Sequence, residues 1–461
     1  MKEKDNSRRD FIKKTAMAGA GITIGGMGLS AKSYAAIKGA NERVNIAVIG
    51  IRGQGGTHIS SWCGLKDSRN VFLKTLCDVD ESLFAEKSAT VAQKTGKKPL
   101  TEWDMRKVFD DKEIHAVSFA TPNFWHALGT IWACQAGKHV YVEKPASHNI
   151  WEGRKMIEAA RKYNRIVQVG FQNRSFNNVR EAIKFLHEGG IGDVYAARGL
   201  CIKPRDPFGV SKDSAPPASL HYDNWLGPVT YRPYNEKKGH YNWHWFWDTG
   251  NGDTGNQGPH QFDIARWGLN KNEHPVSVYS TGGVYGWDPK ECAQETPNMQ
   301  SSLFKYQDGK ILEFETRGGY SNSETGLDIR IGNMFYGSEG YLEINGTSWN
   351  AYRKRETTPF AGSSSAAPVP VDPRTPPGGT EHYANFIDAI RSGKAETLNC
   401  DINEGHYSSA LPSLANISYR LGRELKFMGG DRDFEKFVND PEADAMLTRA
   451  YRPPYIVPDQ V

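Results

Sequence analysis

The chain has 461 residues, of which 38% are hydrophobic and 24% charged, so it exceeds one ordinary hydrophobic core and predicts two domains with extensions. The formal net charge of +4 comes from the first 35 residues, which hold seven Lys and Arg against three Asp and Glu, while the rest of the chain holds 50 of each sign. A neutral body of this kind argues against a nucleic acid as partner and against attraction to an anionic membrane.

Residues 1–35 are typical of a twin-arginine export signal. The basic segment Ser7–Lys14 contains Arg8 and Arg9, and a weakly apolar stretch rich in Gly and Ala follows from Thr15 to Leu29. A membrane anchor would need about 20 strongly apolar residues. The segment therefore predicts a periplasmic protein that has no membrane association once its signal is removed.

Residues 41–172 alternate short apolar runs with helical stretches. This pattern predicts an α/β Rossmann domain, a doubly wound parallel sheet with crossover helices that binds a dinucleotide. The runs expected to form its strands are Val44–Ile49, Val71–Cys77, Ala116–Ala120, His139–Val142 and Ile166–Gly170.

Residues 173–360 begin with an expected helix at Asn177–His187 and continue with β-type runs, polar turns and few helices. They predict an α+β domain with a large, mostly antiparallel open sheet for substrate and subunit contacts, so a homodimer or homotetramer is expected. The runs expected as strands are Val194–Arg198, Val276–Ser280, Lys310–Phe314 and Tyr341–Ile344.

The Ser, Ala and Pro content of residues 361–379 predicts a surface loop. Residues 380–461 follow as C-terminal helices and a tail. Their two helical segments, Glu381–Arg391 and Asn403–Arg423, are expected to pack back on the first domain. The six cysteines show no C-x-x-C spacing, so most are expected to be buried apolar side chains.

A glycine-rich turn follows the first predicted strand. The run from Gly50 to Gly56 is an imperfect G-x-G-x-x-G, because Arg52 stands at the second glycine position, and a helix is expected to open at Thr57. Such a turn lets a pyrophosphate approach backbone amides at a helix N-terminus, although a turn of purely structural origin is the alternative. The candidate cofactor residues here are Gly50, Arg52, Gly53, Gln54 and Gly55.

Asp78 ends the second predicted strand, where a carboxylate accepts hydrogen bonds from the adenosine ribose hydroxyls. The same carboxylate would repel the 2′-phosphate of NADP, so the choice favours NAD. A helix N-cap is the alternative role for Asp78, but Asp80 is better placed for it.

Two further strand exits carry polar motifs at the carboxyl edge of the sheet, where ligands of open α/β sheets bind. They are Thr121-Pro122-Asn123-Phe124-Trp125-His126 and Glu143-Lys144-Pro145. With these motifs, residues 42–350 resemble the Gfo/Idh/MocA family of glucose-fructose oxidoreductase and inositol dehydrogenase, and the export signal and C-terminal tail resemble its exported branch. The resemblance implies an NAD-dependent oxidoreductase acting on a carbohydrate or glycoside hydroxyl, with the cofactor held by Thr121, Asn123, His126, Glu143, Lys144 and Gln172.

The resemblance also implies the catalytic residues. The Lys144 ammonium would reach the reacting hydroxyl and the nicotinamide ribose, where a cation stabilises a developing alkoxide. His260 would be the base, unless it is a histidine buried for structural reasons. Many family members have an Asp four residues earlier, where this chain has Asn256, and an amide orients an imidazole without balancing its charge. Asp253 and Asp263 are the alternative charge partners.

The candidate substrate residues are Asn173, Trp243, Trp245 and Asp263. Trp243 and Trp245 alternate in an aromatic run, and in an extended segment their rings would share one face and stack on a sugar. A domain core uses the same residues, so that alternative stays open. No metal site is expected.

Export bears on the mechanism, because free nicotinamide cofactor is not expected outside the cytoplasm. An exported enzyme of this type is expected to keep its NAD with a dissociation constant of nanomolar order, roughly −12 kcal/mol. The first hypothesis is a sugar or glycoside dehydrogenase working by ping-pong exchange. The alternatives are a redox-neutral NAD-dependent glycosidase or lyase that passes through a keto sugar, and a sugar-binding protein that keeps NAD as structure.

Overall fold

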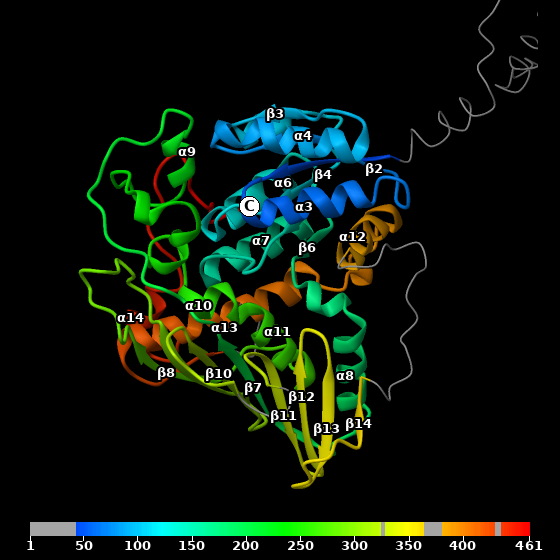
Figure 1. The fold of residues 1–461 in the computed structure, drawn as a ribbon, viewed down its shortest axis with the longest axis vertical. Helices are drawn as coiled ribbons and strands as arrows, with labels where there is room; N and C mark the ends of the chain where they lie inside the picture. The colour runs from blue at the N-terminus through cyan, green and yellow to red at the C-terminus, as the bar shows by residue number, and fades with distance from the viewer. Residues whose placement is uncertain (1–42, 324–327, 364–379, 429–434) are drawn as a thin grey trace, which may run out of the picture. The chain divides into compact units, whose positions relative to one another are not determined.

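The computed structural model describes residues 43–323, 328–363, 380–428 and 435–461. The predicted export signal lies outside these residues, and so does most of the predicted loop at 361–379. Two sheets organise the described chain (Figure 1).

The first sheet has six strands in the order β3-β2-β1-β4-β5-β6, and every neighbouring pair is parallel. A hydrophobic core packs on each of its faces, so β1 is buried along its whole length. The strands are β1 Val44–Ile49, β2 Val71–Cys77, β3 Leu100–Glu102, β4 Ala116–Phe119, β5 His139–Val142 and β6 Val167–Val169.

Crossover helices connect these strands, as the doubly wound fold predicted from the sequence requires. They are α3 Gly53–Gly64, α4 Phe84–Thr95, α5 Met105–Asp110, α6 His126–Gln135 and α7 Ile150–Lys162. The sequence did not predict β3, which is short, lies at the sheet edge and has no buried residue.

The second sheet has nine strands in the order β14-β13-β12-β11-β7-β10-β9-β8-β15. All neighbours are antiparallel except β7 and β10, so the predicted mostly antiparallel sheet is confirmed. The predicted loop is wrong in its first two residues, which form β14. The strands are β7 Val194–Ile202, β8 Ser277–Gly283, β9 Met299–Lys305, β10 Ile311–Arg317, β11 Ile331–Gly337, β12 Gly340–Asn345, β13 Trp349–Arg353, β14 Ala361–Gly362 and β15 Leu425–Lys426.

Strand β9 reverses the usual alternation of polar and apolar side chains. Gln300, Ser302 and Phe304 are buried, whereas Met299 and Leu303 are 42% and 43% exposed. Because polar residues occupy part of the inner face, no strand signal is visible in the sequence.

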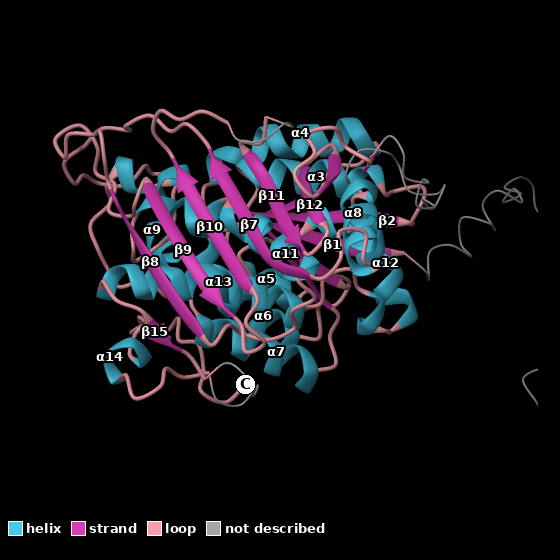
Figure 2. Ribbon diagram, turned by 90° about the horizontal axis from the view of Figure 1, so that it is seen from below, coloured by secondary structure: helices cyan, strands magenta, loops and turns pink. Residues whose placement is uncertain are grey.

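Helices cover one face of the second sheet, and Figure 2 shows the other face without a covering layer. On the covered face, Phe262 of α11 packs on Phe314 of β10 with 4.3 Å between ring centroids. The helices of this half are α8 Asn177–His187, α9 Tyr222–Leu226, α10 Gly252–Asn256, α11 Gly258–Gly268, α13 Ile402–Leu421 and α14 Pro441–Asp444.

The C-terminal helices pack in two different places. α12 (Glu381–Ser392) lies on the parallel sheet, where Tyr383 stacks on Tyr141 at 4.6 Å between ring centroids. α13 contacts both halves, since Ile402 belongs to the core of the first sheet and Leu414 to that of the second. The expectation that both helices pack on the first domain is therefore wrong for much of α13.

All six cysteines lie in the described part of the chain, where they are buried and form no disulfide. Burial raises the pKa of Cys63 to about 11 and the pKa values of Cys134 and Cys201 to about 12. They act as small apolar side chains, as their spacing indicated.

A buried charge cluster joins the two halves. Arg174, which follows β6, donates hydrogen bonds to Asp263 of α11 at 2.8 and 2.9 Å, and Arg266 donates to Glu404 of α13 at 2.6 Å. Burial opposes the ionisation of Asp263, but the charge of Arg174 holds the Asp263 pKa below its usual range. Two cations and two carboxylates therefore balance one another inside the protein.

We predict that Asp263→Asn lowers the free energy of unfolding by about 3 kcal/mol, because it leaves buried arginine charge uncompensated. Chemical denaturation followed by circular dichroism measures this change. Glu188→Gln is the matched control, since Glu188 and its partner Lys184 are 65% and 69% exposed and such surface pairs contribute little. Equal unfolding midpoints for Asp263→Asn and the wild type would show that the cluster does not stabilise the junction.

Candidate active site

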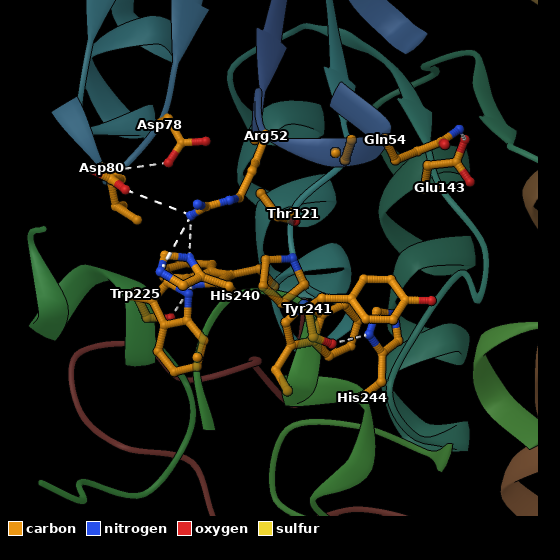
Figure 3. Close-up of a pocket in the computed structure, with 18 of the residues that line it drawn as sticks. Arg52, Gln54, Asp78, Asp80, Thr121, Glu143, Trp225, His240, Tyr241 and His244 are labelled. Carbon is orange, nitrogen blue, oxygen red and sulfur yellow. Dashed lines mark hydrogen bonds and ion pairs between the residues drawn. The ribbon is translucent and has the colours of Figure 1, made fainter. Parts of the chain in front are cut away.

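A cavity of about 610 Å³ opens at the carboxyl ends of β1, β2, β4 and β5 (Figure 3). The first domain lines one side, and residues between Lys203 and His260 line the other. The sequence-predicted residues that line it are Gly50, Arg52, Gly53, Gln54, Asp78, Thr121, His126, Glu143, Lys144, Gln172, Trp243, Asn256 and His260.

The glycine-rich turn leads into α3, which begins at Gly53 and not at Thr57 as expected. Arg52 precedes the helix and its side chain makes no cap, so the first-turn N–H groups have no acceptor within the helix. Gly50 has a φ of +84°, and a Cβ there would lie 2.7 Å from the backbone of Ala120, so only glycine fits. Free amides at a helix N-terminus fit a pyrophosphate.

Asp78 lies at the next strand exit. Its Oδ2 accepts a hydrogen bond from the Ile51 amide at 2.8 Å, and its Oδ1 accepts one from the Asp80 amide at 2.9 Å. Each oxygen keeps a lone pair that can accept from a ribose hydroxyl. Burial raises the pKa of Asp78 to about 6. Thr121 Oγ1 in the same cavity is buried without a partner among the described residues, so the lining offers polar groups that fit NAD.

Glu143 organises the middle of the cavity. Its Oε1 accepts hydrogen bonds from Gln172 at 2.7 Å, His58 at 3.0 Å and Gln54 at 3.1 Å, and its Oε2 accepts one from the Lys144 amide at 3.2 Å. Burial alone would raise the pKa of Glu143, but the hydrogen bond from His58 and nearby positive charge lower it to about 2. Glu143 is therefore an ionised carboxylate that positions the groups around it.

Lys144 lies at the end of the cavity away from Asp78. Its Nζ donates a 2.8 Å hydrogen bond to the backbone carbonyl of Asn256, the last residue of α10. Burial lowers the pKa of Lys144, and the charge of Glu143 opposes that shift. The ammonium is thus fixed between the two domains.

The His260 imidazole, on α11, lines the same cavity. Burial, followed by the charge of Lys144, lowers the His260 pKa to about 3, so the ring is neutral. Its Nδ1 is buried with no hydrogen-bond partner in the part of the chain that the structure describes. The predicted pairing with Asn256 is wrong, because α10 ends at Asn256 and its amide donates instead to Tyr241 Oη at 3.0 Å.

The alternative charge partners of His260 are engaged elsewhere. Asp253 accepts hydrogen bonds from Arg205 at 2.7 and 3.0 Å, and Asp263 is held in the charge cluster with Arg174. Neither carboxylate lines the cavity. The prediction of Asp263 as a substrate residue is therefore wrong, and the ion pair expected for His260 does not form.

The aromatic run forms a 3-10 helix, His240–Trp245, and not the expected extended segment. Trp243 lines the cavity and stacks on His244 at 3.6 Å between ring centroids. Trp245 turns away from the cavity and is 5% exposed, with the Arg205 guanidinium 5.0 Å from its ring. The prediction of Trp245 as a substrate residue is therefore wrong.

Three other predicted residues lie outside this cavity. A Cβ at Gly55 would meet the Gly50 carbonyl at 2.0 Å, so Gly55 serves the packing of α3 against its loop. The Asn123 amide donates to Asn251 Oδ1 at 2.7 Å. Asn173 lines a separate cavity of about 400 Å³.

Contacts that the second domain makes across the cavity were not predicted from the sequence. The guanidinium of Arg52 contacts the His240 imidazole and lies 3.9 Å from Asp80 Oδ2 (Figure 3). Tyr241 and His244 from the same 3-10 helix also line the cavity, as does Lys203. Partners separated by more than a hundred residues leave no local signal in the sequence.

Family models match both domains. Residues 44–171 match an oxidoreductase family with an NAD-binding Rossmann fold, and residues 210–318 and 371–457 match the C-terminal α/β domain of that family. The chain belongs to the Gfo/Idh/MocA oxidoreductase family. Its first domain is thus an NAD-binding domain, as the lining of the cavity indicates.

Relatives within the family share part of the chain. A levoglucosan dehydrogenase from Pseudarthrobacter phenanthrenivorans is 29% identical over 309 residues, which cover 64% of this chain and 68% of the relative. A glycosyl hydrolase family 109 protein from Solibacter usitatus is 30% identical over 168 residues, covering 34% and 37%.

Solved structures share the fold. An aldose-aldose oxidoreductase from Caulobacter crescentus complexed with glycerol superposes with a TM-score of 0.61 at 18% identity, covering 83% of this chain and 99% of the other. A levoglucosan dehydrogenase in complex with NADH and levoglucosan gives the same TM-score and coverage at 19% identity.

One group of potential metal ligands occurs among the described residues, although none was expected. His274, His406 and Glu435 approach one another away from the cavity. Glu435 Oε1 accepts hydrogen bonds from His406 at 2.6 Å and His274 at 2.8 Å, and also from Arg154 at 2.7 Å. Because the Arg154 guanidinium of α7 donates to the same Glu435 oxygen, this group links the C-terminal tail to α7 by hydrogen bonds.

We predict that NAD release becomes faster as the pH falls from 7.5 to 5. Above its pKa of about 6, the Asp78 carboxylate is ionised, and both of its oxygens can accept hydrogen bonds from ribose hydroxyls. Below this pH the carboxyl is protonated, so one oxygen becomes a donor and an acceptor for the ribose is lost. The rate of NADH fluorescence loss on dilution measures release at each pH. Asp78→Asn is the control and is expected to release NADH faster at every pH, with a flatter profile. A pH dependence unchanged in that variant would exclude Asp78 as its origin.

Proposed function

We propose that this protein oxidises a hydroxyl group of a sugar or glycoside, using NAD that it keeps bound between turnovers. The observation that carries the proposal is the pair formed by the Lys144 ammonium and the neutral His260 imidazole, both facing the cavity of an NAD-binding domain. The names of the relatives support a carbohydrate as substrate, since one is a levoglucosan dehydrogenase and a structural neighbour is an aldose-aldose oxidoreductase.

The two residues divide the acid-base work of such a reaction. Bound NAD supplies the hydride acceptor. Lys144, held by the Asn256 carbonyl, donates a hydrogen bond to the substrate oxygen and stabilises the negative charge that develops there. His260 is neutral and so has a free lone pair to take the hydroxyl proton. Its low pKa makes it a weak base, so proton transfer depends on Lys144 making the hydroxyl more acidic.

Contacts over the cavity support retention of the cofactor. Arg52, at the N-terminus of α3, reaches His240 of the second domain and the Asp80 carboxylate (Figure 3). These contacts link the two domains across the cavity, and we expect them to slow the release of a bound dinucleotide.

Export to the periplasm by the twin-arginine route is part of the proposal. It rests on residues 1–35, which lie outside the described residues. Within the described chain, no helix has the length and apolar character needed to cross a membrane.

A homodimer or homotetramer is also proposed. One face of the second sheet has no covering layer (Figure 2). Its strands β8 and β9 expose Tyr279, Met299 and Leu303 by 45%, 42% and 43%. Apolar side chains gathered on one sheet face are typical of an interaction surface.

Net oxidation is favoured over a redox-neutral glycosidase or lyase reaction. That reaction needs a second base for a ring C–H. The carboxylates Asp253 and Asp263 could supply one, but both are paired with arginines outside the cavity. The tyrosines that line the cavity, Tyr222, Tyr234 and Tyr241, are the remaining candidates.

Mass spectrometry of the denatured, purified protein tests cofactor retention. We expect about one NAD per chain without added cofactor, because nanomolar binding survives purification. His240→Ala is expected to lose most of its NAD during dialysis, since the contact with Arg52 is removed, whereas His187→Ala on the surface is the control. If the purified protein carries no NAD, cofactor retention is contradicted, and an ordinary dehydrogenase whose NAD dissociates is indicated.

The reacting pair is tested by Lys144→Met, which keeps most of the unbranched side chain but removes the charge. Sugar oxidation is expected to fall by about 10³-fold while NAD remains bound, because alkoxide stabilisation is lost. Formation of NADH absorbance in a single turnover measures the step. Lys237→Met, outside the cavity, is the control. Full activity of Lys144→Met would contradict the assignment, and an inactive wild type with bound NAD and sugar would favour a non-catalytic sugar-binding protein.

A further inference from the structure

Among the described residues, the Lys203 ammonium group has no hydrogen-bond or ion-pair partner, and it lies at the reacting end of the cavity. It is the first residue after β7, its amide donates to the Arg317 carbonyl at 3.2 Å, and its side chain is half-buried in the cavity lining. Within the described residues, no carboxylate lies within ion-pair distance of its ammonium group. Nothing in the function proposed above uses this residue.

The carboxylates near Lys203 are already neutralised. Asp253 takes two hydrogen bonds from Arg205, with which it forms an ion pair at 2.7 Å. Glu143 is surrounded by its own donors and adjoins Lys144, whose charge it balances. The reacting end therefore keeps one uncompensated positive charge, that of Lys203.

The imidazoles of this region do not supply negative charge, and they do not add positive charge either. Burial lowers the pKa values of His244 and His260 to about 3, so both rings are neutral. Burial also lowers the pKa of Lys144, and the positive charge of Lys203 contributes to that shift. Two ammonium groups so near each other repel, and a negatively charged ligand relieves the repulsion.

We propose that the substrate carries a carboxylate, which binds Lys203 while its hydroxyl binds Lys144. The substrate class is then a sugar acid, such as a uronic acid, and not a neutral sugar. This inference rests on the proposed function and names its substrate class.

A single charge argues for a carboxylate over a phosphate. One unpaired lysine balances one negative charge, whereas a phosphate monoester carries ≈ −1.5 to −2 at neutral pH. The pyrophosphate of NAD already has a site at the free amides that begin α3. Lys203 instead lies near Lys144, because its positive charge lowers the Lys144 pKa.

Binding to the NAD-loaded protein tests the inference without requiring turnover. Isothermal titration compares D-glucuronate with D-glucose and D-galacturonate with D-galactose, and D-glucose 6-phosphate serves as the phosphate arm. We expect each uronate to bind at least tenfold more tightly than its neutral partner, and the phosphate to show no such gain. A charged hydrogen bond contributes enough for this difference.

Three variants test whether Lys203 causes the preference for uronates over neutral sugars. Lys203→Met is expected to remove the uronate preference, to leave binding of the neutral sugar within about twofold and to keep NAD bound, while Lys203→Arg retains most of the preference because the charge remains. Lys237→Met, which lies outside the cavity, is expected to behave as the wild type. Kinetic measurements with the same sugars are expected to show the change in KM and not in kcat.

The inference is overturned if the wild type binds each uronate and its neutral partner equally, if glucose 6-phosphate binds more tightly than glucuronate, or if Lys203→Met weakens both sugars alike. Loss of NAD from Lys203→Met would also overturn it, since the lysine would then hold the cofactor. The proposed function fails separately, when Lys144→Met retains full oxidation of whichever sugar the wild type oxidises.

Discussion

The active cavity depends on one buried carboxylate. Glu143 collects hydrogen bonds from His58 and Gln54 on α3, from Gln172 after β6 and from the amide of Lys144. Three strand exits are thereby fixed to a single point. A buried ionised carboxylate without donors would cost several kcal/mol, and these four donors offset that cost. The result is a rigid setting for the Lys144 ammonium, which a flexible lysine would otherwise lack.

The second domain completes a site that the first domain only begins. Strand exits of the parallel sheet supply the cofactor side, whereas His260, Tyr241 and Lys203 approach from across the cavity. Helix α13 and the charge cluster of Asp263 set the distance between the two halves. Fold stability and catalytic geometry therefore rest on the same junction, and damage to one is expected to disturb the other.

Local patterns in the sequence predicted the elements that depend on residues close together in the chain. The strand Val44–Ile49, the turn at Gly50 and the Glu-Lys-Pro motif depend on neighbours in the chain. They bring Ile49, Gly50, Glu143 and Lys144 to the cavity. The role of Asn256 was not predictable, because it depends on α10 ending there, with only Gln257 between it and α11. The pairing of Asp253 with Arg205, 48 residues away, was equally hidden. Long-range ion pairs decide which carboxylates are free, and periodicity does not report them.

Burial protects the six thiols from oxidation only once the chain has folded. In the folded protein burial raises the thiol pKa of five of the six cysteines, so little of the oxidant-sensitive thiolate exists. An unfolded chain would expose all six, and six cysteines can pair in 15 ways, none of which belongs to this fold. Oxidation of the unfolded chain would therefore compete with folding, whereas the folded protein keeps its thiols buried and protonated.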